Sequence, residues 1–316
     1  MRALALTFVL LLAAVAPAQT LASKPAPAPK QNSGIVFWKM APHSVEFLLN
    51  NIPQRDPIRL AQLKQTFTDL QCRGSNLREQ SFAGGKNLLC ILPGTPPVAK
   101  PGPVPGHAPE TGTILFIAHY EHQGSGQSAV DNWSGAIMLS FLYHALSATP
   151  RQHTFLFAEV NGDPGAEALF NSFSLAQRHD MQAVIALDSL GLGPAQYYIN
   201  PNDTSSSYEW FWIHDQLLNA AADLRLPQPV AAIPGGWFKT DVTRPFRYHG
   251  IPSIVIHSVN LNARDLPGSA SDTAKAIDHN AYFNTIALLS VYAAEMDLKW
   301  PSPISGSSAP SNHHRH

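Results

Sequence analysis

Three apolar runs in the sequence each end in side chains that can bind a metal ion or move a proton. The first run is followed by His119 and, after a Gly/Ser-rich loop, by Asp131. The second ends in Glu159, and the third ends at Asp188. One imidazole and several carboxylates from separate segments suit a divalent cation such as zinc, and a further carboxylate can act as a general base on water. The pattern therefore predicts metal-assisted hydrolysis.

Each of these residues also has an ordinary structural explanation. Asp131 could cap the helix that is predicted to begin at Trp133, and Asp188 could be a turn residue. His119 could be a hydrogen-bonded core histidine. Glu159 is harder to explain in this way, because a buried carboxylate at the end of an apolar strand needs a partner or a role. The prediction depends on the combination rather than on any single residue.

Motifs of other enzyme classes are missing from the sequence. The loop GSGQS at residues 124–128 lacks the lysine of a phosphate-binding P-loop and does not open directly into a predicted helix. The chain has no G-x-S-x-G elbow, no HExxH motif and no dinucleotide-binding glycine fingerprint. Serine-hydrolase and nucleotide-dependent mechanisms are therefore disfavoured.

The elements that must position these residues alternate along the chain. Continuous apolar runs predict strands that are covered on both faces, at residues 113–118, 153–158, 182–187 and 251–256. Apolar periodicity predicts helices at residues 57–70, 133–148, after Gly165, 206–222 and 276–297. This alternation predicts a three-layer α/β/α domain with a mostly parallel, mixed central sheet. Functional groups gather at the carboxyl ends of strands in such sheets, which is where the candidates lie.

A proline-rich segment, residues 93–109, interrupts this pattern. Neither a helix nor an interior strand tolerates so many prolines, so the segment is predicted to be a loop. It separates two strand-like runs, residues 87–92 and 113–118. We expect it to be the loop of a hairpin rather than a linker between domains.

The N-terminus predicts export from the cytoplasm. Residues 1–18 combine Arg2, an apolar run and small residues before a cleavage site near Ala18, which is typical of a secretory signal peptide. An uncleaved anchor is the alternative, but the run is short for a bilayer span of about 20 residues. We expect a secreted or periplasmic protein without stable membrane insertion after cleavage. The rest of the chain is expected to divide into a Pro/Ala-rich spacer at 19–34, a single domain at 35–300 and a disordered tail at 301–316.

Composition excludes several classes of protein. The 316 residues are 45% hydrophobic and 14% charged, with a formal net charge of −1, which rules out general disorder and a broadly basic nucleic-acid surface. Two cysteines are too few for a disulfide scaffold or a thiolate zinc site. In an oxidising compartment Cys72 and Cys90 could form one disulfide or remain two buried thiols. The fourteen histidines leave imidazole as the main supply of nitrogen ligands.

The order and spacing of seven motifs resemble peptidase family M28, which contains co-catalytic zinc aminopeptidases and glutaminyl cyclases. The resemblance covers roughly residues 35 to 298, and its motifs are NLLCILPG (87–94), FIAHYE (116–121), DNWSGA (131–136), FLFAEVNGDPGA (155–166), IALDSLG (185–191), RPFRYHGIPSIVI (244–256) and SDTAKAID (271–278). The resemblance implies a zinc-exopeptidase-like fold and assigns roles to individual residues. His119 and Asp188 match ligands of one zinc ion. Asp131 matches the carboxylate that bridges two zinc ions, and Glu159 matches the general base.

Two ligand positions of the family are changed in this chain. Val160 stands where the family has a glutamate, and Gly268 stands where it has a histidine. Both positions belong to the same metal ion, so the resemblance implies one intact zinc site and one lost site. The family's cyclases use the lost set, so glutamine cyclisation is not expected. A replacement ligand could come from elsewhere, with His257 as the first choice, followed by His249, His122 and Glu167.

Two functional hypotheses follow. The first is a secreted zinc-dependent hydrolase of peptide bonds, of the exopeptidase or aminopeptidase type, in which Glu159 is the base that activates water at the metal. Its partner would be a peptide or protein substrate rather than a nucleic acid. The alternative is a catalytically impaired pseudo-peptidase that serves as a binding or accessory module. A third possibility, a polymer-binding domain that uses tryptophan and tyrosine, rests on composition alone.

Overall fold

The computed structural model describes residues 42–95, 112–198, 208–231 and 240–299, and these all belong to one unit, Ile35–His316. The predicted signal peptide (1–18), spacer (19–34) and tail (301–316) lie outside the described residues, as does most of the proline-rich segment. Among the residues that are described, no helix is both long enough and apolar enough to cross a bilayer.

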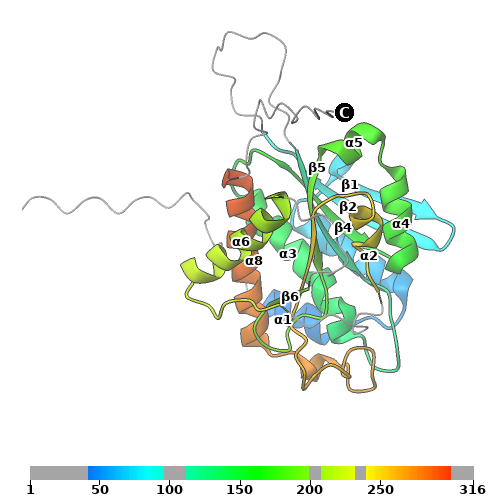
Figure 1. The fold of residues 1–316 in the computed structure, drawn as a ribbon. Coiled ribbons are helices and arrows are strands. Elements are labelled where there is room, and N and C mark those ends of the chain that lie inside the picture. The colour runs from blue at the N-terminus through cyan, green and yellow to red at the C-terminus, as the bar shows by residue number, and fades with distance from the viewer. Residues whose placement is uncertain (1–41, 96–111, 199–207, 232–239, 300–316) are drawn as a thin grey trace, which may run out of the picture. The chain divides into compact units, whose positions relative to one another are not determined.

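Seven strands form one mixed sheet in the order β1–β2–β4–β3–β5–β7–β6. Several of these strands lie at the centre of the molecule in Figure 1. Their bounds are β1 (Leu77–Phe82), β2 (Gly85–Leu92), β3 (Thr113–His119), β4 (Thr154–Val160), β5 (Met181–Leu187), β6 (Gln196–Tyr198) and β7 (Ser253–His257). The four central strands, β4, β3, β5 and β7, run parallel to one another. The edges are completed by antiparallel pairing of β1 with β2, of β2 with β4 and of β6 with β7. The predicted mixed sheet is confirmed.

Side chains of the central strands enter two separate cores in alternation. In β3, Ile114 and Phe116 belong to one core, whereas Leu115 and Ile117 belong to the other. Successive side chains of a strand point to opposite faces, so a strand covered on both faces is apolar throughout. This explains why the strands appear in the sequence as continuous apolar runs.

Helices cover both faces of the sheet, which confirms the three-layer α/β fold (Figure 1). The larger core also includes side chains of α1 (Pro42–Asn50), α2 (Asp56–Asp69), α3 (Gly135–Ser147), α6 (Tyr208–Asp223) and α8 (His279–Lys299). The smaller core is covered by α4 (Gly162–Ser172) and α7 (Arg244–Arg247). Four short helices complete the described elements: α5 (Leu175–Asp180), η1 (Gly74–Asn76), η2 (Ala129–Ser134) and η3 (Ala274–Ala276).

The prediction of a hairpin between residues 87–92 and 113–118 is wrong. These runs form β2 and β3, and β4 lies between them in the sheet. β2 instead makes a hairpin with β1, through a tight turn that pairs Phe82 with Gly85. The other edge of β2 pairs with β4, so no edge is left for β3. Proximity along the chain therefore did not decide the pairing.

The last helix begins later than predicted. The periodicity suggested a start at residue 276, but α8 begins at His279 after the separate turn η3. The carboxylate of Asp278 accepts a hydrogen bond from the backbone N–H of Ala281 at 3.1 Å. Such a cap satisfies a backbone donor that the first turn of a helix leaves free, so the helix starts there.

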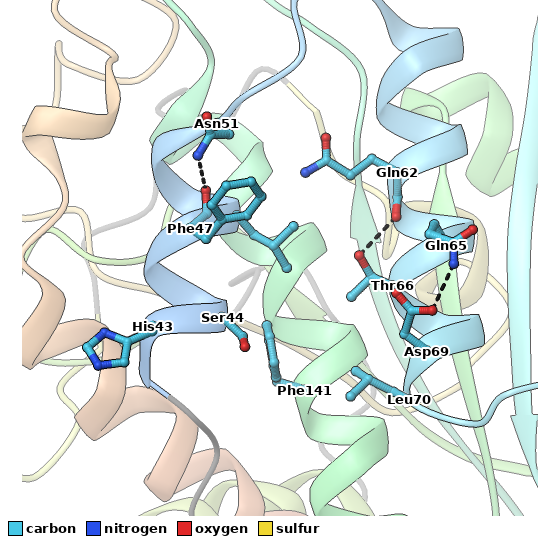
Figure 2. A pocket seen from close by; sticks show the side chains of 11 residues that line it. His43, Ser44, Phe47, Asn51, Gln62, Gln65, Thr66, Asp69, Leu70 and Phe141 are labelled. Carbon is cyan, nitrogen blue, oxygen red and sulfur yellow. Dashed lines mark hydrogen bonds between the residues drawn. The ribbon is translucent and has the colours of Figure 1, made fainter.

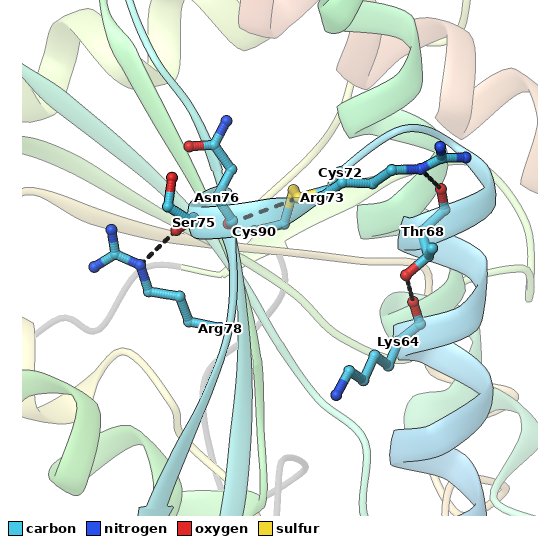
Figure 3. Close-up of a disulfide and its surroundings, with 8 residues drawn as sticks. All are labelled: Lys64, Thr68, Cys72, Arg73, Ser75, Asn76, Arg78 and Cys90. Atoms are coloured by element: carbon cyan, nitrogen blue, oxygen red, sulfur yellow. Dashed lines mark hydrogen bonds between the residues drawn. A yellow bond between two sulfur atoms is a disulfide. The ribbon is translucent and has the colours of Figure 1, made fainter.

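Cys72 and Cys90 form a disulfide (Figure 3). Both residues are fully buried, and their Cα atoms are 6.2 Å apart. The bond ties the segment that follows α2 to the middle of β2. Of the two alternatives that the sequence left open, the structure has the disulfide.

A groove of about 650 Å³ opens between α1 and α2, with Phe141 of α3 at its base (Figure 2). Its lining combines the apolar side chains of Phe47, Leu48 and Leu70 with several amides. None of its lining residues is a candidate from the sequence, so the groove is separate from the site described next.

Candidate metal centre

Three of the candidate residues meet at the carboxyl edge of the central sheet. His119 is the last residue of β3, and Asp188 directly follows β5, which is the neighbouring strand. Asp131 enters from η2, the irregular turn that precedes α3. One ligand atom from each of the three residues lies within 4.8 Å of the other two. The side chains that the sequence placed at separate strand ends are therefore brought together.

The imidazole of His119 is at the centre of this group. Its Nε2 atom lies 3.4 Å from Oδ1 of Asp131 and 3.6 Å from Oδ2 of Asp188. On the other side of the ring, Nδ1 lies 3.2 Å from Oε1 of Glu121. An imidazole that ligates a metal through one nitrogen commonly gives its other N–H to a carboxylate. Glu121 can supply that carboxylate.

Asp272 holds the backbone of the Asp131 segment in place. Its Oδ1 accepts a hydrogen bond from the N–H of Val130 at 2.7 Å, and its Oδ2 accepts from the N–H of Asp131 at 3.2 Å. The same Oδ2 accepts from Gly268 at 2.9 Å. Asp272 is fully buried, so these donors replace the water that its charge has lost. The hydrogen bonds from Val130 and Asp131 join residues 142 and 141 positions apart, so no local pattern in the sequence indicates this role.

Asn132 ties the Asp131 segment to the Asp188 segment. Its Nδ2 donates to the carbonyl of Leu187 at 2.7 Å, and its Oδ1 accepts from the N–H of Ser189 at 3.0 Å. The residues on both sides of Asp188 are thus hydrogen-bonded to the residue after Asp131. The two carboxylates are positioned by one amide side chain.

The electrostatics of the group favour a bound cation. Burial, and then the charge of Asp188, raise the pKa of Asp131 to about 7. Burial opposes protonation of His119, but Glu121 and Asp188 outweigh it and raise the pKa of His119 well above its usual value. Neither ring nitrogen of His119 makes a well-formed hydrogen bond within the described residues. An imidazole and two carboxylates that face one another in this way fit the donor set of zinc.

Glu159 lies next to this group on β4. It pairs with Ala118 of β3 and is fully buried. Neither of its carboxylate oxygens has a hydrogen-bond partner in the described part of the chain. Burial raises the pKa of Glu159 well above its usual value, although His119 opposes the shift. Glu159 is thus a buried carboxyl group with a perturbed pKa beside side chains that could hold a metal ion, which is a common feature of functional sites.

A family model described as peptidase family M28 matches residues 102–293, which is more than half of the chain. The protein belongs to peptidase family M28. Solved structures with this fold include a zinc aminopeptidase from Bacillus subtilis, at 17% identity and a TM-score of 0.54, covering 68% of this chain and 51% of that one. This M28 protein therefore spans about half the length of that aminopeptidase. No curated protein matches it.

Glutaminyl cyclases also share the fold of this M28 protein. The cyclase from Macrostomum lignano has 17% identity and a TM-score of 0.61, covering 81% of this chain and 88% of its own. The cyclase from an Acidobacteriales bacterium has 18% identity and a TM-score of 0.61, covering 85% and 98%. At these identities the likeness concerns the fold, so the chemistry must be argued from the residues of this chain.

The second metal position of the family has no ligands in this M28 chain at the two places where they are expected. Val160 is fully buried in the smaller core with Leu169. Gly268 has a φ of +69°, which favours glycine over histidine. Its carbonyl accepts a hydrogen bond from Ser125 at 3.2 Å, and a Cβ atom on Gly124 would overlap it. The Gly/Ser loop and the Gly268 turn therefore pack backbone against backbone.

None of the four replacement ligands joins the metal-binding group within the described ranges. His249 and Glu167 are exposed, and Nε2 of His122 contacts the carbonyl of Gly126. His257 is buried at the end of β7, where its Nδ1 accepts a hydrogen bond from Val259 at 3.1 Å. The described residues thus contain one group of side chains that could hold a metal ion, not two.

Proposed function

We propose that this protein is a zinc-dependent hydrolase of peptide bonds, of the aminopeptidase type, that works with one zinc ion. The observation that carries the proposal is the convergence of His119, Asp131 and Asp188 beside the buried carboxyl of Glu159 in an M28 fold. Three protein ligands leave one position of a tetrahedral zinc open for substrate or water, as catalytic sites require.

Each residue of the site then has a defined task. His119, Asp131 and Asp188 would hold the zinc, and Glu121 fixes the orientation of the His119 ring. A zinc ion in this place supplies Lewis acidity, which polarises the scissile carbonyl and acidifies water. Glu159 takes a proton from the attacking water on a carboxylate oxygen and returns it to the leaving amine nitrogen, so that peptide and water become a carboxylic acid and an amine.

Export of the protein is part of the proposal. The apolar run of residues 1–18 supports a signal peptide, and the Cys72–Cys90 disulfide suits an oxidising compartment. The substrate is then a peptide or protein in the periplasm or outside the cell.

A pseudo-peptidase is the second candidate function, and one specific observation favours it. The ligand positions of the second metal are occupied by Val160 and Gly268, and the backbone around Gly268 is packed against Gly124. An enzyme whose relatives use two metal ions would lose part of its stabilisation of the transition state through this change. In this case the fold would bind peptides without cleaving them.

Activity measurements separate these functions. The mature protein, loaded with zinc, is assayed on a panel of aminoacyl anilides and peptides that includes an N-terminal glutamine peptide. Glu159→Gln is compared with the matched control Glu167→Gln, an exposed glutamate on α4. We expect hydrolysis by the wild type and the control, and a loss of about 100-fold or more in Glu159→Gln. Zinc binding without any Glu159-dependent turnover would favour the pseudo-peptidase, and ring closure of the glutamine peptide without hydrolysis would indicate a cyclase.

A further inference from the structure

Arg59 is a fully buried arginine of α2, and no role in the site has been assigned to it so far. It is one of the largest side chains without exposed surface in the described residues. Arginine is almost never fully buried unless its charge and its donors are satisfied. We propose that Arg59 is a positioning residue of the metal centre, because it fixes the loop that joins His119 to Asp131. This inference rests on the proposed zinc site.

The guanidinium of Arg59 forms hydrogen bonds with both ends of that loop. Its Nη1 donates to the carbonyls of Tyr120 at 3.0 Å and Glu121 at 3.2 Å, the two residues that directly follow His119. Its Nη2 donates to the carbonyl of Gln127 at 2.6 Å, four residues before Asp131. Buried carbonyl groups of a loop need hydrogen-bond donors, and the rigid guanidinium group of Arg59 donates to three of these carbonyls.

The side chain of Arg59 is itself held in a fixed orientation. Its Nε donates to the carbonyl of Pro53 at 2.8 Å, just before α2 begins. Its guanidinium lies over the ring of Trp133, 5.4 Å from the centroid. Trp133 follows the Asp131–Asn132 pair and donates from its indole N–H to the carbonyl of Leu48 at 2.9 Å. Arg59 therefore contacts the chain on both sides of the ligand Asp131.

Gln127 links Arg59 to Asp131 through hydrogen bonds. Its backbone N–H donates to the carbonyl of Asp272 at 2.7 Å, and its side-chain oxygen accepts from the N–H of Ala274 at 2.9 Å. The carboxylate of Asp272 in turn accepts from the N–H of Asp131. A continuous path of hydrogen bonds thus runs from α2, through the loop, to the backbone of a metal ligand.

The charge of Arg59 also suits this position. Its guanidinium donates hydrogen bonds to carbonyl oxygens. Its positive charge interacts with the carboxylate of Asp56 and, more weakly, with those of Glu121, Asp272 and Asp131. Opposite charges interact strongly where the surroundings exclude water. A lysine in place of Arg59 keeps the positive charge but lacks the planar guanidinium group with its several donors. The substitution therefore separates the contribution of the charge from that of the hydrogen bonds.

A matched control is available at the opposite edge of the sheet. Asp297 of α8 is a buried charge whose Oδ1 accepts from the N–H groups of Gln152 and His153, just before β4. Its removal should lower stability in the same way as removal of Arg59. It is distant along β4 from Glu159, so a purely structural loss there should leave the metal centre unchanged.

The test is zinc affinity, measured by competition with a chromogenic chelator on the folded mature protein, with Arg59→Lys, Arg59→Met and Asp297→Asn. We expect both Arg59 variants to bind zinc about 10- to 100-fold more weakly than the wild type, and Asp297→Asn to bind as tightly despite a lower melting temperature. Cobalt substitution gives a second readout: the visible spectrum should change in Arg59→Lys if the ligands have moved. If Arg59→Met does not fold, Arg59→Lys decides the question by itself.

The outcomes distinguish the inference from the proposed function. A wild type that binds no zinc overturns both. A wild type that binds zinc, with Arg59→Lys retaining its affinity and cobalt spectrum, overturns the positioning role and leaves the proposed function standing. An equal loss of zinc affinity in Asp297→Asn also overturns the positioning role of Arg59, because a general loss of stability would then explain the weaker zinc binding.

Discussion

At the scale of single residues, burial of the Glu159 carboxyl group opposes its ionisation in the folded protein. Its carboxyl group is fully buried and has no hydrogen-bond partner among the described residues. Burial disfavours the charged form, so the folded protein holds the proton more tightly than the unfolded chain does. Residues that destabilise the fold in this way are commonly kept for function.

The first prediction is that Glu159→Gln stabilises the metal-free protein while it removes activity. Because the folded-state pKa is raised, stability is highest below the unfolded value of about 4.3 and falls as the pH rises towards the folded value. Glutamine has the same shape and no charge to bury. We therefore expect a higher melting temperature than the wild type at pH 7, by about 2–4 °C for each kcal/mol gained, and little difference at pH 4.

Glu167→Gln serves as the control in the same pH series. Glu167 is exposed, so its substitution should leave the melting temperature unchanged at both pH values. A Glu159→Gln protein that is less stable than the wild type at pH 7 would contradict the assignment of an unpaired buried carboxyl.

The second prediction concerns Glu121, which lies 3.2 Å from Nδ1 of His119. The charge of His119 outweighs burial and lowers the pKa of Glu121 to about 2, so Glu121 is ionised at neutral pH. Glu121→Gln should weaken zinc binding about 10- to 100-fold, since the imidazole loses a charged acceptor. Glu121→Asp, which keeps the charge on a shorter side chain, should retain more of the affinity than Glu121→Gln. Equal zinc affinities of the wild type and Glu121→Gln, measured by chelator competition, would refute the role.

The sequence predicted the site residues that are marked by their neighbours along the chain. It did not predict the site residues whose hydrogen-bond partners are far away in the sequence. His119 and Asp188 were found because each directly follows an apolar run that could only be a buried strand. Arg59 and Asp272 were missed because the hydrogen bonds that connect them to the site join residues 61 to 142 positions apart. No local pattern distinguishes such a buried charge from one on the surface of a helix.

At the scale of elements, the Gly/Ser loop and the Gly268 turn pack backbone against backbone. Gly124 has a φ of +75°, and a Cβ atom there would overlap the carbonyl of Gly268. A Cβ atom on Gly126 would overlap the carbonyl of Ser269. The glycines that resembled a phosphate loop thus allow two backbones to approach closely.

The third prediction tests this contact with two Gly→Ala substitutions. Gly74 has a φ of +61°, and a Cβ atom there would meet no atom within 4 Å. Gly74→Ala should therefore cost only the strain of the left-handed backbone, about 1–2 kcal/mol. Gly124→Ala adds a steric overlap with backbone and should cost roughly 2 kcal/mol more, as measured by urea unfolding. Equal losses in the two variants would show that the loop and the turn are not packed together.

The more deeply a strand is buried, the more clearly the sequence predicts it. The central strands are covered on both faces and stand out as apolar runs, whereas β1, with the sequence LREQSF, is a polar edge strand that has no such signal. The predicted hairpin between residues 87–92 and 113–118 is wrong for the same reason. The strand that pairs with β2 is β1, and the sequence of β1 has no apolar pattern that predicts a strand. The start of α8 was missed because Asp278, rather than the apolar periodicity, decides where that helix begins.

At the scale of the whole molecule, the disulfide links the helical layer to the sheet (Figure 3). The fourth prediction is that Cys72→Ser with Cys90→Ser lowers the free energy of unfolding by about 3 kcal/mol, since the bond closes a loop with a sequence separation of 18. The wild type unfolded in a reducing agent should show the same loss. Unchanged stability in both cases would mean that the disulfide does not form.

The central claim for the whole molecule is that the protein binds one zinc ion, at the group formed by His119, Asp131 and Asp188. Metal analysis of the purified mature protein by mass spectrometry tests this most directly, with His119→Ala as the site variant and the exposed His249→Ala as its control. We expect about one zinc ion per chain in the wild type and the control, and almost none in His119→Ala. Two zinc ions per chain, or none in the wild type, would contradict the claim.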